Sequence, residues 1–201
     1  MNDKFFDLKK EKQDRIINAA LKIFSLHAYR HASTDEMVQE AGISKGLLFH
    51  YFDNKLGLYS FLYAYSIKYV AIELYQTVSI KENNYFELLK QVEYAHYQAM
   101  TVYPYMLFFL ERADKEVEIE VCEAIEDKKK ERATAYSRIY QHASQIDFKE
   151  NIDPQQALHI IQYTIDGIKS EYAGAGMDDG KEMYMQLALY LDTLQALYLR
   201  C

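Results

Sequence analysis

Residues 34–55 read TDEMVQEAGISKGLLFHYFDNK, and this stretch decides the fold of the region around it. Ser33 precedes it as a candidate N-cap, with a glutamate three residues later, which is the spacing of a capping box. Gly42 can take the left-handed conformation that ends a helix, and Ser44 can cap the helix that follows. We therefore predict two short helices joined by a tight turn, the second over about residues 45–52.

The second of these helices is too short to be stable alone and depends on its neighbours. Leu48 and Phe52 lie four residues apart and are expected to face inward. The remaining positions then form a basic and aromatic outer face: Lys45, Gly46, Phe49, His50 and Tyr51. An outer face of this kind suits a helix whose N-terminal end enters the major groove of DNA.

Residues 41–58, AGISKGLLFHYFDNKLGL, resemble the helix-turn-helix signature of TetR-family transcriptional regulators, A-G-[VI]-S-x-G-x-x-Y-x-[YH]-F-x-x-K. The similarity extends over about residues 12–58. Two positions depart from the family pattern. Phe49 stands where the family usually has a tyrosine, which removes a hydroxyl that could bind phosphate, and Ala28 stands where a glycine often ends the first helix.

Composition favours an all-α protein. Half of the 201 residues are hydrophobic, and the chain has only seven glycines and two prolines, so turn formers are scarce. The length allows one or two domains with a substantial core. The resemblance implies an N-terminal three-helix helix-turn-helix DNA-binding domain at residues 1–55 and a C-terminal helical ligand-binding and dimerisation domain at residues 56–201.

The net charge of −7 belongs to the second of these regions. Residues 1–60 have a net charge of +1, and the remaining residues have a net charge of −8. Net charge bears on solubility and non-specific binding rather than on fold. We expect a small, nearly neutral DNA-binding module on an acidic body, which would need to dimerise to gain affinity for DNA.

Apolar periodicity and cap residues predict the other helices. The proposed N-caps include Asn83 or Asn84 and the pair Asp153-Pro154. Residues 1–12 are expected to be either a frayed tail or a basic arm that touches phosphates. The clearest break in the chain is the glycine- and aspartate-rich stretch 173–180. The predicted helices span residues 13–26, 56–78, 84–103, 105–112, 115–146, 154–172 and 181–199.

The last two predicted helices, 154–172 and 181–199, carry more apolar residues than one core-facing stripe requires. Excess apolar surface of this kind is typical of an interface. In TetR-like proteins the last two long helices form a two-fold four-helix dimer interface. We therefore expect a homodimer through these helices, bound to a palindromic double-stranded DNA operator and acting as a regulator, more often a repressor than an activator.

The candidate DNA contacts follow from chemistry and from position in the family motif. Hydroxyls and backbone amides at helix N-termini can bind phosphates. A lysine can reach phosphate or a guanine edge, and an aromatic ring can contact a thymine methyl group. For each residue a position on the surface without DNA contact stays an alternative. The candidates are Thr34, Ser44, Lys45, Gly46, Phe49, His50, Tyr51 and, as a phosphate clamp, Lys55.

Most of the nineteen tyrosines follow the helix-turn-helix. Ordinary core packing explains some of them, but together they suit a roomy apolar cavity with a few polar groups. Such a cavity could hold an aromatic, lipophilic or cationic effector, whose binding would shift the dimer away from operator spacing. The residues expected in its wall, one from each of five successive helices, are Tyr63, Tyr97, Phe108, Tyr136 and Tyr163.

Other functions have less support in the sequence. No glycine-rich phosphate loop, His/Cys metal spacing or nucleophile elbow is present, so we expect no enzyme, no metal and no cofactor. A TetR-like adaptor whose C-terminal domain binds a protein instead of a small molecule stays an alternative. No apolar run approaches the length of a membrane span, and the first residues lack the apolar segment of a signal peptide. We therefore expect a cytoplasmic protein.

Overall fold

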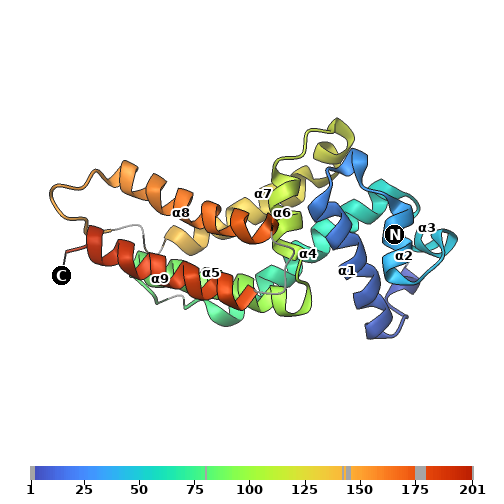
Figure 1. Ribbon diagram of the computed structural model, residues 1–201, viewed down its shortest axis with the longest axis horizontal. Coiled ribbons are helices and arrows are strands. Elements are labelled where there is room, and N and C mark those ends of the chain that lie inside the picture. The colour runs from blue at the N-terminus through green and yellow to red at the C-terminus, as the bar shows by residue number, and fades with distance from the viewer. Residues whose placement is uncertain (1–2, 80, 142, 144–145, 175–179, 201) are drawn as a thin grey trace. The chain divides into compact units, whose positions relative to one another are not determined.

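A computed structural model describes residues 3–79, 81–141, 143, 146–174 and 180–200. Within these ranges the chain is built from helices (Figure 1), so the prediction of an all-α fold is confirmed. Their bounds are α1 Lys10–Leu26, α2 Thr34–Ala41, α3 Lys45–Phe52, α4 Lys55–Thr77, α5 Tyr85–Val102, α6 Met106–Asp114, α7 Ile119–Gln141, α8 Pro154–Gly174 and α9 Gly180–Tyr198.

The helix ends follow the predicted caps. The Ser33 hydroxyl accepts a hydrogen bond from the amide of Glu36, and Asn84 Oδ1 accepts from the amides of Phe86 and Glu87. Asp153 Oδ1 accepts from the amide two residues beyond Pro154, at 2.8 Å. These bonds satisfy amides that have no partner inside the helix. Of the predicted break at residues 173–180, residues 173 and 174 are the last of α8 and residue 180 is the first of α9, whereas residues 175–179 lie outside the described residues.

The chain forms two compact units. Unit 1 consists of residues 1–71 and 99–133, and unit 2 consists of residues 72–98 and 134–201. Helices α4, α5 and α7 each run from one unit into the other. The predicted domain boundary at residue 55 was placed at the end of the helix-turn-helix motif, whereas these units are defined by compactness. The boundary therefore stays a prediction.

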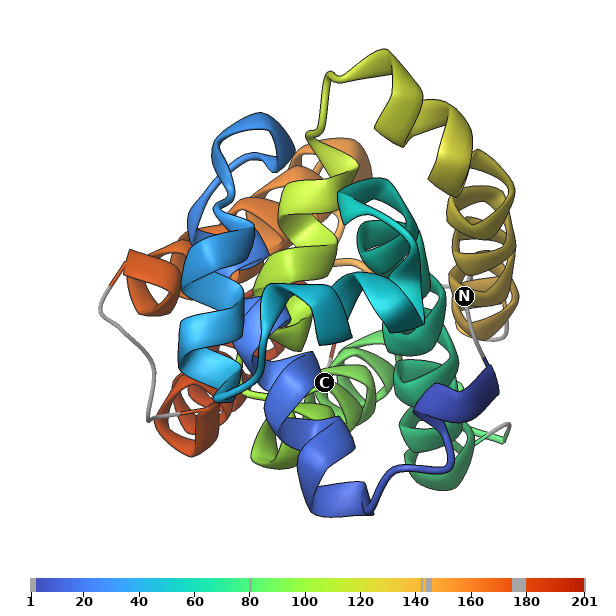
Figure 2. The same cartoon turned by 90° about the vertical axis from the view of Figure 1, so that its right-hand side faces the viewer.

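In unit 1, α1 packs against both α2 and α6, and Figure 2 faces this group of helices. Phe24 of α1, Tyr59 of α4 and Phe109 of α6 form its aromatic centre, with ring centroids 4.8 Å apart for Phe24 and Tyr59 and 5.0 Å apart for Tyr59 and Phe109. All three side chains are buried. Aromatic pairs of this geometry contribute about 0.5–1.5 kcal/mol beyond the area they bury.

The frayed N-terminal tail was a wrong prediction for the described residues. Residues Asp3–Phe5 form a 3₁₀ turn, and Phe5 is fully buried against Tyr51, Phe52 and Phe61. A charged segment can be ordered in this way because one large apolar side chain anchors it in the core.

In unit 2, α8 and α9 lie side by side (Figure 1). Their buried residues face the rest of the unit and include Ile161 and Ile165 of α8 and Leu187 and Leu191 of α9. No helix among the described residues is long and apolar enough to cross a membrane.

Candidate nucleic-acid interface

The turn between α2 and α3 has the geometry that its sequence predicts. Gly42 has φ 63° and ψ 42°, a left-handed conformation that other residues rarely adopt. The amide of Ile43 donates to the carbonyl of Val38, which closes the end of α2. The hydroxyl of Ser44 accepts from the amide of Leu47 at 3.2 Å and so begins α3 at Lys45.

The two faces of α3 are arranged largely as the sequence predicts. Leu48 and Phe52 are buried, whereas Lys45, Gly46 and His50 are exposed. Phe49 is half-buried, so part of its ring faces solvent. Thr34 is the first residue of α2, and Ser44 is the cap residue of α3, so both lie at helix N-termini. The motif therefore presents a short surface of basic, small and aromatic groups with unpaired amides beside it.

The predicted exposure of Tyr51 on the outer face of α3 was wrong. Its side chain is only 7% exposed, because the ring of Phe5 packs against it edge to face with centroids 5.7 Å apart. The N-terminal segment therefore covers the position that the helical spacing left outside. Tyr51 holds that segment on α3, and the expected outer face loses this residue.

Lys45 forms an ion pair with Asp35 of α2, with Nζ to carboxylate oxygen distances of 2.9 and 3.0 Å. Both side chains are largely exposed. Exposed ion pairs of this kind contribute about 0–1 kcal/mol. A DNA phosphate can therefore replace Asp35 as the partner of Lys45 at small cost.

Lys55 lies at the start of α4, where a phosphate clamp was expected, but its ammonium group already has partners in the protein. It donates to the carbonyl oxygens of Arg30 at 3.3 Å and Ala32 at 3.0 Å and lies 4.6 Å from the ring centroid of Tyr29. Burial lowers the pKa of Lys55. Its observed role is to hold the connector between α1 and α2.

The joint between α3 and α4 is very tight. A Cβ atom on Gly57 would lie 2.1 Å from the carbonyl oxygen of Phe52. The amide of Gly57 donates to Asn54 Oδ1 at 2.8 Å. Asp53 between these helices has φ 64° and ψ −54°, and the amide of Asn54 donates to the carbonyl of Phe52 across it at 2.7 Å, which makes a γ-turn. The position of α3 therefore depends on a glycine at residue 57.

The five aromatic residues predicted to line an effector cavity are divided between the two units. Tyr63 and Phe108 are buried in unit 1, and Tyr97 and Tyr136 are half-buried in unit 2. Tyr163 is 73% exposed on α8, so its assignment to an internal wall was wrong. Other residues of α8 form the apolar stripe that faces the core. A groove of about 540 Å³ in unit 1 is lined by other side chains, among them Arg15, Asn18 and Tyr105.

Sequence reasoning missed a buried ionic cluster in unit 2. Glu93 of α5 accepts a hydrogen bond from Lys169 of α8 at 3.0 Å, forms an ion pair with it at 2.9 Å through its second oxygen, and lies 3.2 Å from Nδ1 of His96. Nε2 of His96 is 2.5 Å from the hydroxyl of Tyr136 in α7. Glu93, His96 and Lys169 are each less than 10% exposed. The spacing of Glu93 and His96, three residues apart in an apolar helix, was the available signal.

The charges in this cluster perturb one another. Burial raises the pKa of Glu93, but the ammonium group of Lys169 and the imidazole of His96 outweigh it and lower the pKa to about 2. Burial strongly raises the pKa of Tyr140 nearby, and the Glu93 charge adds to this effect. The cluster therefore joins α5, α7 and α8 through an ionised carboxylate that water does not reach. Among the described residues no three His, Cys, Asp or Glu side chains are grouped so that they could hold a metal ion.

Comparisons with known proteins agree with this geometry. Residues 16–60 match the family model described as bacterial regulatory proteins, tetR family. The comparison with curated proteins finds no match.

Solved structures share the fold of the whole chain. A TetR family transcriptional regulator from Chloroflexus aurantiacus J-10-FL is 19% identical, with a TM-score of 0.67 over 100% of this chain and 99% of that one. A putative tetR family transcription regulator from Shewanella sp. PV-4 is 20% identical, with a TM-score of 0.55 over 96% and 100%. SmeT, the repressor of the Stenotrophomonas maltophilia multidrug efflux pump SmeDEF, is 17% identical, with a TM-score of 0.52 over 98% and 93%.

Proposed function

Because residues 16–60 match the tetR family of bacterial regulatory proteins and the chain has the fold of TetR-family transcriptional regulators, we propose that this protein is a DNA-binding transcriptional repressor. It binds a palindromic operator as a homodimer, and a small hydrophobic or aromatic effector releases it. The observation that carries this proposal is α3, a helix capped by Ser44 whose exposed face is formed by Lys45, Gly46, Phe49 and His50.

Each exposed group of α3 has a task in the major groove. Lys45 exchanges Asp35 for a phosphate or a guanine edge. Gly46 lets the backbone of α3 approach the DNA closely, because a side chain at this position would lie between the backbone and the DNA. Phe49 contacts a thymine methyl group, and His50 donates to a phosphate or a base. Thr34 and Ser44 place helix N-terminal amides near the DNA backbone.

The homodimer forms through α8 and α9. Six large apolar side chains on these two helices are at least 45% exposed in the single chain, and buried residues of the same helices hold them to unit 2. An apolar surface of this extent is typical of an interface, and a two-fold axis would pair it with its own copy. These side chains are Ile160, Tyr163, Met185, Leu189, Tyr190 and Leu197.

The selection of operator DNA from a random duplex library tests this function. The protein is expected to enrich sequences with two half-sites related by two-fold symmetry, about 10 base pairs or a multiple of that apart. Phe49→Ala should lower affinity for the selected sequence by about 10- to 100-fold, since a base contact is lost. Tyr75→Ala, which removes an aromatic ring that is 90% exposed on α4, is the control and should bind like the wild type.

The same assay examines the dimer. Leu189→Asp places a carboxylate in the apolar face of α9, and two-fold symmetry would bury one such charge from each copy in the interface. This variant should elute as a monomer on size-exclusion chromatography and lose the palindromic operator. The function is wrong if the wild type enriches no sequence, or if Leu189→Asp binds the palindrome as tightly as the wild type does.

Two buried hydroxyl groups on α4 support an effector with a polar group. Ser66 is fully buried, and its hydroxyl has no hydrogen-bond partner among the described residues. The hydroxyl of Tyr63 lies near the ion pair of Asp114 and Arg132 but makes no hydrogen bond of ordinary geometry. Buried polar groups without a partner are uncommon, and a hydroxyl or carbonyl group of an effector would supply the missing partner.

We expect a mainly apolar compound with one hydroxyl or carbonyl group to bind here. In a thermal-shift screen such a compound should raise the melting temperature, because it binds the folded state alone. It should also weaken operator binding by the ratio of its affinities for the two dimer forms. A compound that stabilises the protein without weakening operator binding would bind elsewhere.

A further inference from the structure

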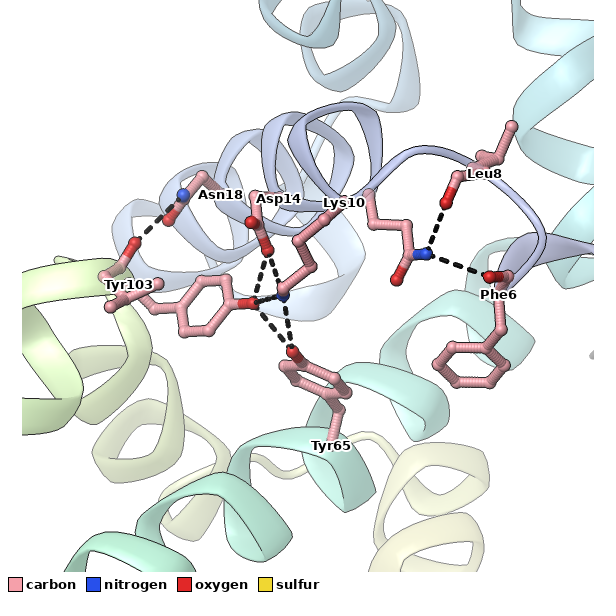
Figure 3. Close-up of polar contacts among 9 residues, drawn as sticks. Phe6, Leu8, Lys10, Asp14, Asn18, Tyr65 and Tyr103 are labelled. Carbon is pink, nitrogen blue, oxygen red and sulfur yellow. Dashed lines mark hydrogen bonds and ion pairs between the residues drawn. The ribbon is translucent and has the colours of Figure 1, made fainter.

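Helix α1 carries two separate sets of contacts. One face supplies the buried core of the helix-turn-helix, with Ile16, Ile17, Ala20 and Phe24. The other carries Lys10, Asp14 and Asn18, which are four residues apart and so follow one stripe along the helix. Figure 3 shows that this polar stripe points toward Tyr65 of α4 and Tyr103, the residue that follows α5.

The hydroxyl group of Tyr103 is the centre of this contact. It donates to Asp14 Oδ1 at 2.5 Å, and Nζ of Lys10 donates to it at 2.7 Å (Figure 3). The hydroxyl of Tyr65 lies 2.7 Å away. Because the single proton of Tyr103 goes to Asp14, Tyr65 must be the donor to Tyr103. The oxygen of Tyr103 therefore makes three hydrogen bonds, and this arrangement satisfies all of them at once.

The surroundings make this contact rigid and directional. Tyr103 is fully buried, and burial together with its bond to Asp14 raises the pKa of its hydroxyl, so it stays a neutral donor. One turn further along α1, Asn18 Nδ2 donates to the carbonyl of Val102 at 3.2 Å. Hydrogen bonds to ionised groups are stronger than neutral ones and depend on geometry. The first half of α1 is thus attached to the C-terminal end of α5 in one defined orientation.

We infer that Tyr103 is a positioning residue for operator binding: it fixes α1, and with α1 the helix-turn-helix, to α4 and the end of α5. This inference rests on the proposed function. Since α1 packs on α2 and α2 packs on α3, a change in the orientation of α1 moves both helices. In a dimer, the orientation of this group of helices sets the distance between the two copies of α3. Tyr103 therefore determines which half-site spacing the protein accepts.

The experiment compares Tyr103→Phe with Tyr59→Phe on a series of operators. The series keeps the selected half-sites and changes their separation by one or two base pairs. Wild type and Tyr59→Phe, a buried tyrosine of α4 outside this contact, should discriminate strongly against the altered spacings. In Tyr103→Phe the ratio of affinities for the selected and the altered spacings should be about 10-fold smaller than in the wild type, which is the effect expected from the loss of one hydrogen bond to a charged group. Asp14→Asn should act in the same direction, and the double variant should add little.

A second measurement separates failure of this inference from failure of the proposed function. Hydrogen exchange of the amides of residues 10–18 should be faster in Tyr103→Phe than in the wild type, while exchange in α2 is unchanged. This readout needs no DNA. If the wild type selects no operator, the proposed function fails and hydrogen exchange alone decides whether Tyr103 holds α1. If Tyr103→Phe matches Tyr59→Phe in both spacing preference and exchange, the inference is overturned.

Discussion

Lys169→Met is expected to destabilise the protein by about 3–5 kcal/mol, the cost of removing one partner from a buried ion pair. The substitution keeps most of the side-chain volume but leaves the Glu93 carboxylate with His96 as its remaining partner in the cluster. Glu93 is 5% exposed, so water cannot replace the missing ammonium group. Denaturant unfolding followed by circular dichroism measures the loss.

The pH dependence identifies the cause of this loss. In the wild type the pKa of Glu93 is lowered to about 2, so its contribution to stability is present above about pH 4.5 and is lost as the pH falls toward 2. Without Lys169, burial raises the pKa of Glu93. The variant therefore regains stability when the carboxyl group takes up a proton, because the unpaired buried charge is then neutralised. The difference between variant and wild type should therefore shrink as the pH falls, first through the raised pKa of Glu93 in the variant and then below about pH 4.5, where the wild type loses stability.

Two control variants test the assignment to this ion pair. Lys130→Met removes a largely exposed lysine that pairs with Glu126 on α7, and it should leave the free energy of unfolding nearly unchanged. Glu93→Gln combined with Lys169→Met removes both charges and should recover much of the loss. Equal stability of Lys169→Met and Lys130→Met would contradict the proposed role of the cluster.

Gly57→Ala is expected to lower both stability and operator affinity. The new Cβ atom would lie 2.1 Å from the carbonyl oxygen of Phe52, which is backbone and cannot rotate away. Either α3 or α4 must then shift, at a cost of about 1–3 kcal/mol for overpacking. Since α3 carries the proposed base contacts, operator affinity should fall by at least about 10-fold, as expected when a bidentate base contact is misplaced.

Gly46→Ala is the matched control for this substitution. An added Cβ on Gly46 would meet nothing within 4 Å, and alanine favours a helix by about 0.5–1 kcal/mol over glycine. This variant should be as stable as the wild type or more so, and any loss of operator binding would report on the approach of the backbone to DNA. Equal unfolding temperatures for Gly57→Ala and Gly46→Ala would contradict the conclusion that residue 57 has no room for a side chain.

The sequence predicted every α-helix of the described residues, with errors at the ends that were largest for α7, predicted at 115–146 and observed at Ile119–Gln141. Its signals were local: Ser44 caps the amide three residues away, and Gly42 takes its left-handed conformation without any tertiary contact. The same signals placed Leu48 and Phe52 inside and Lys45 and His50 outside. Periodicity could not show that Phe5 would cover Tyr51, because that contact joins segments 46 residues apart.

By itself the sequence determined where helices begin and end, because caps and turns act over three or four residues and carry their own hydrogen bonds. The tertiary structure alone decided the two polar clusters. Glu93 and Lys169 are 76 residues apart, and Asp14 and Tyr103 are 89 residues apart. Charges and hydroxyls become partners at such separations only when packed helices bring them together and exclude water, and a linear pattern contains no record of that encounter.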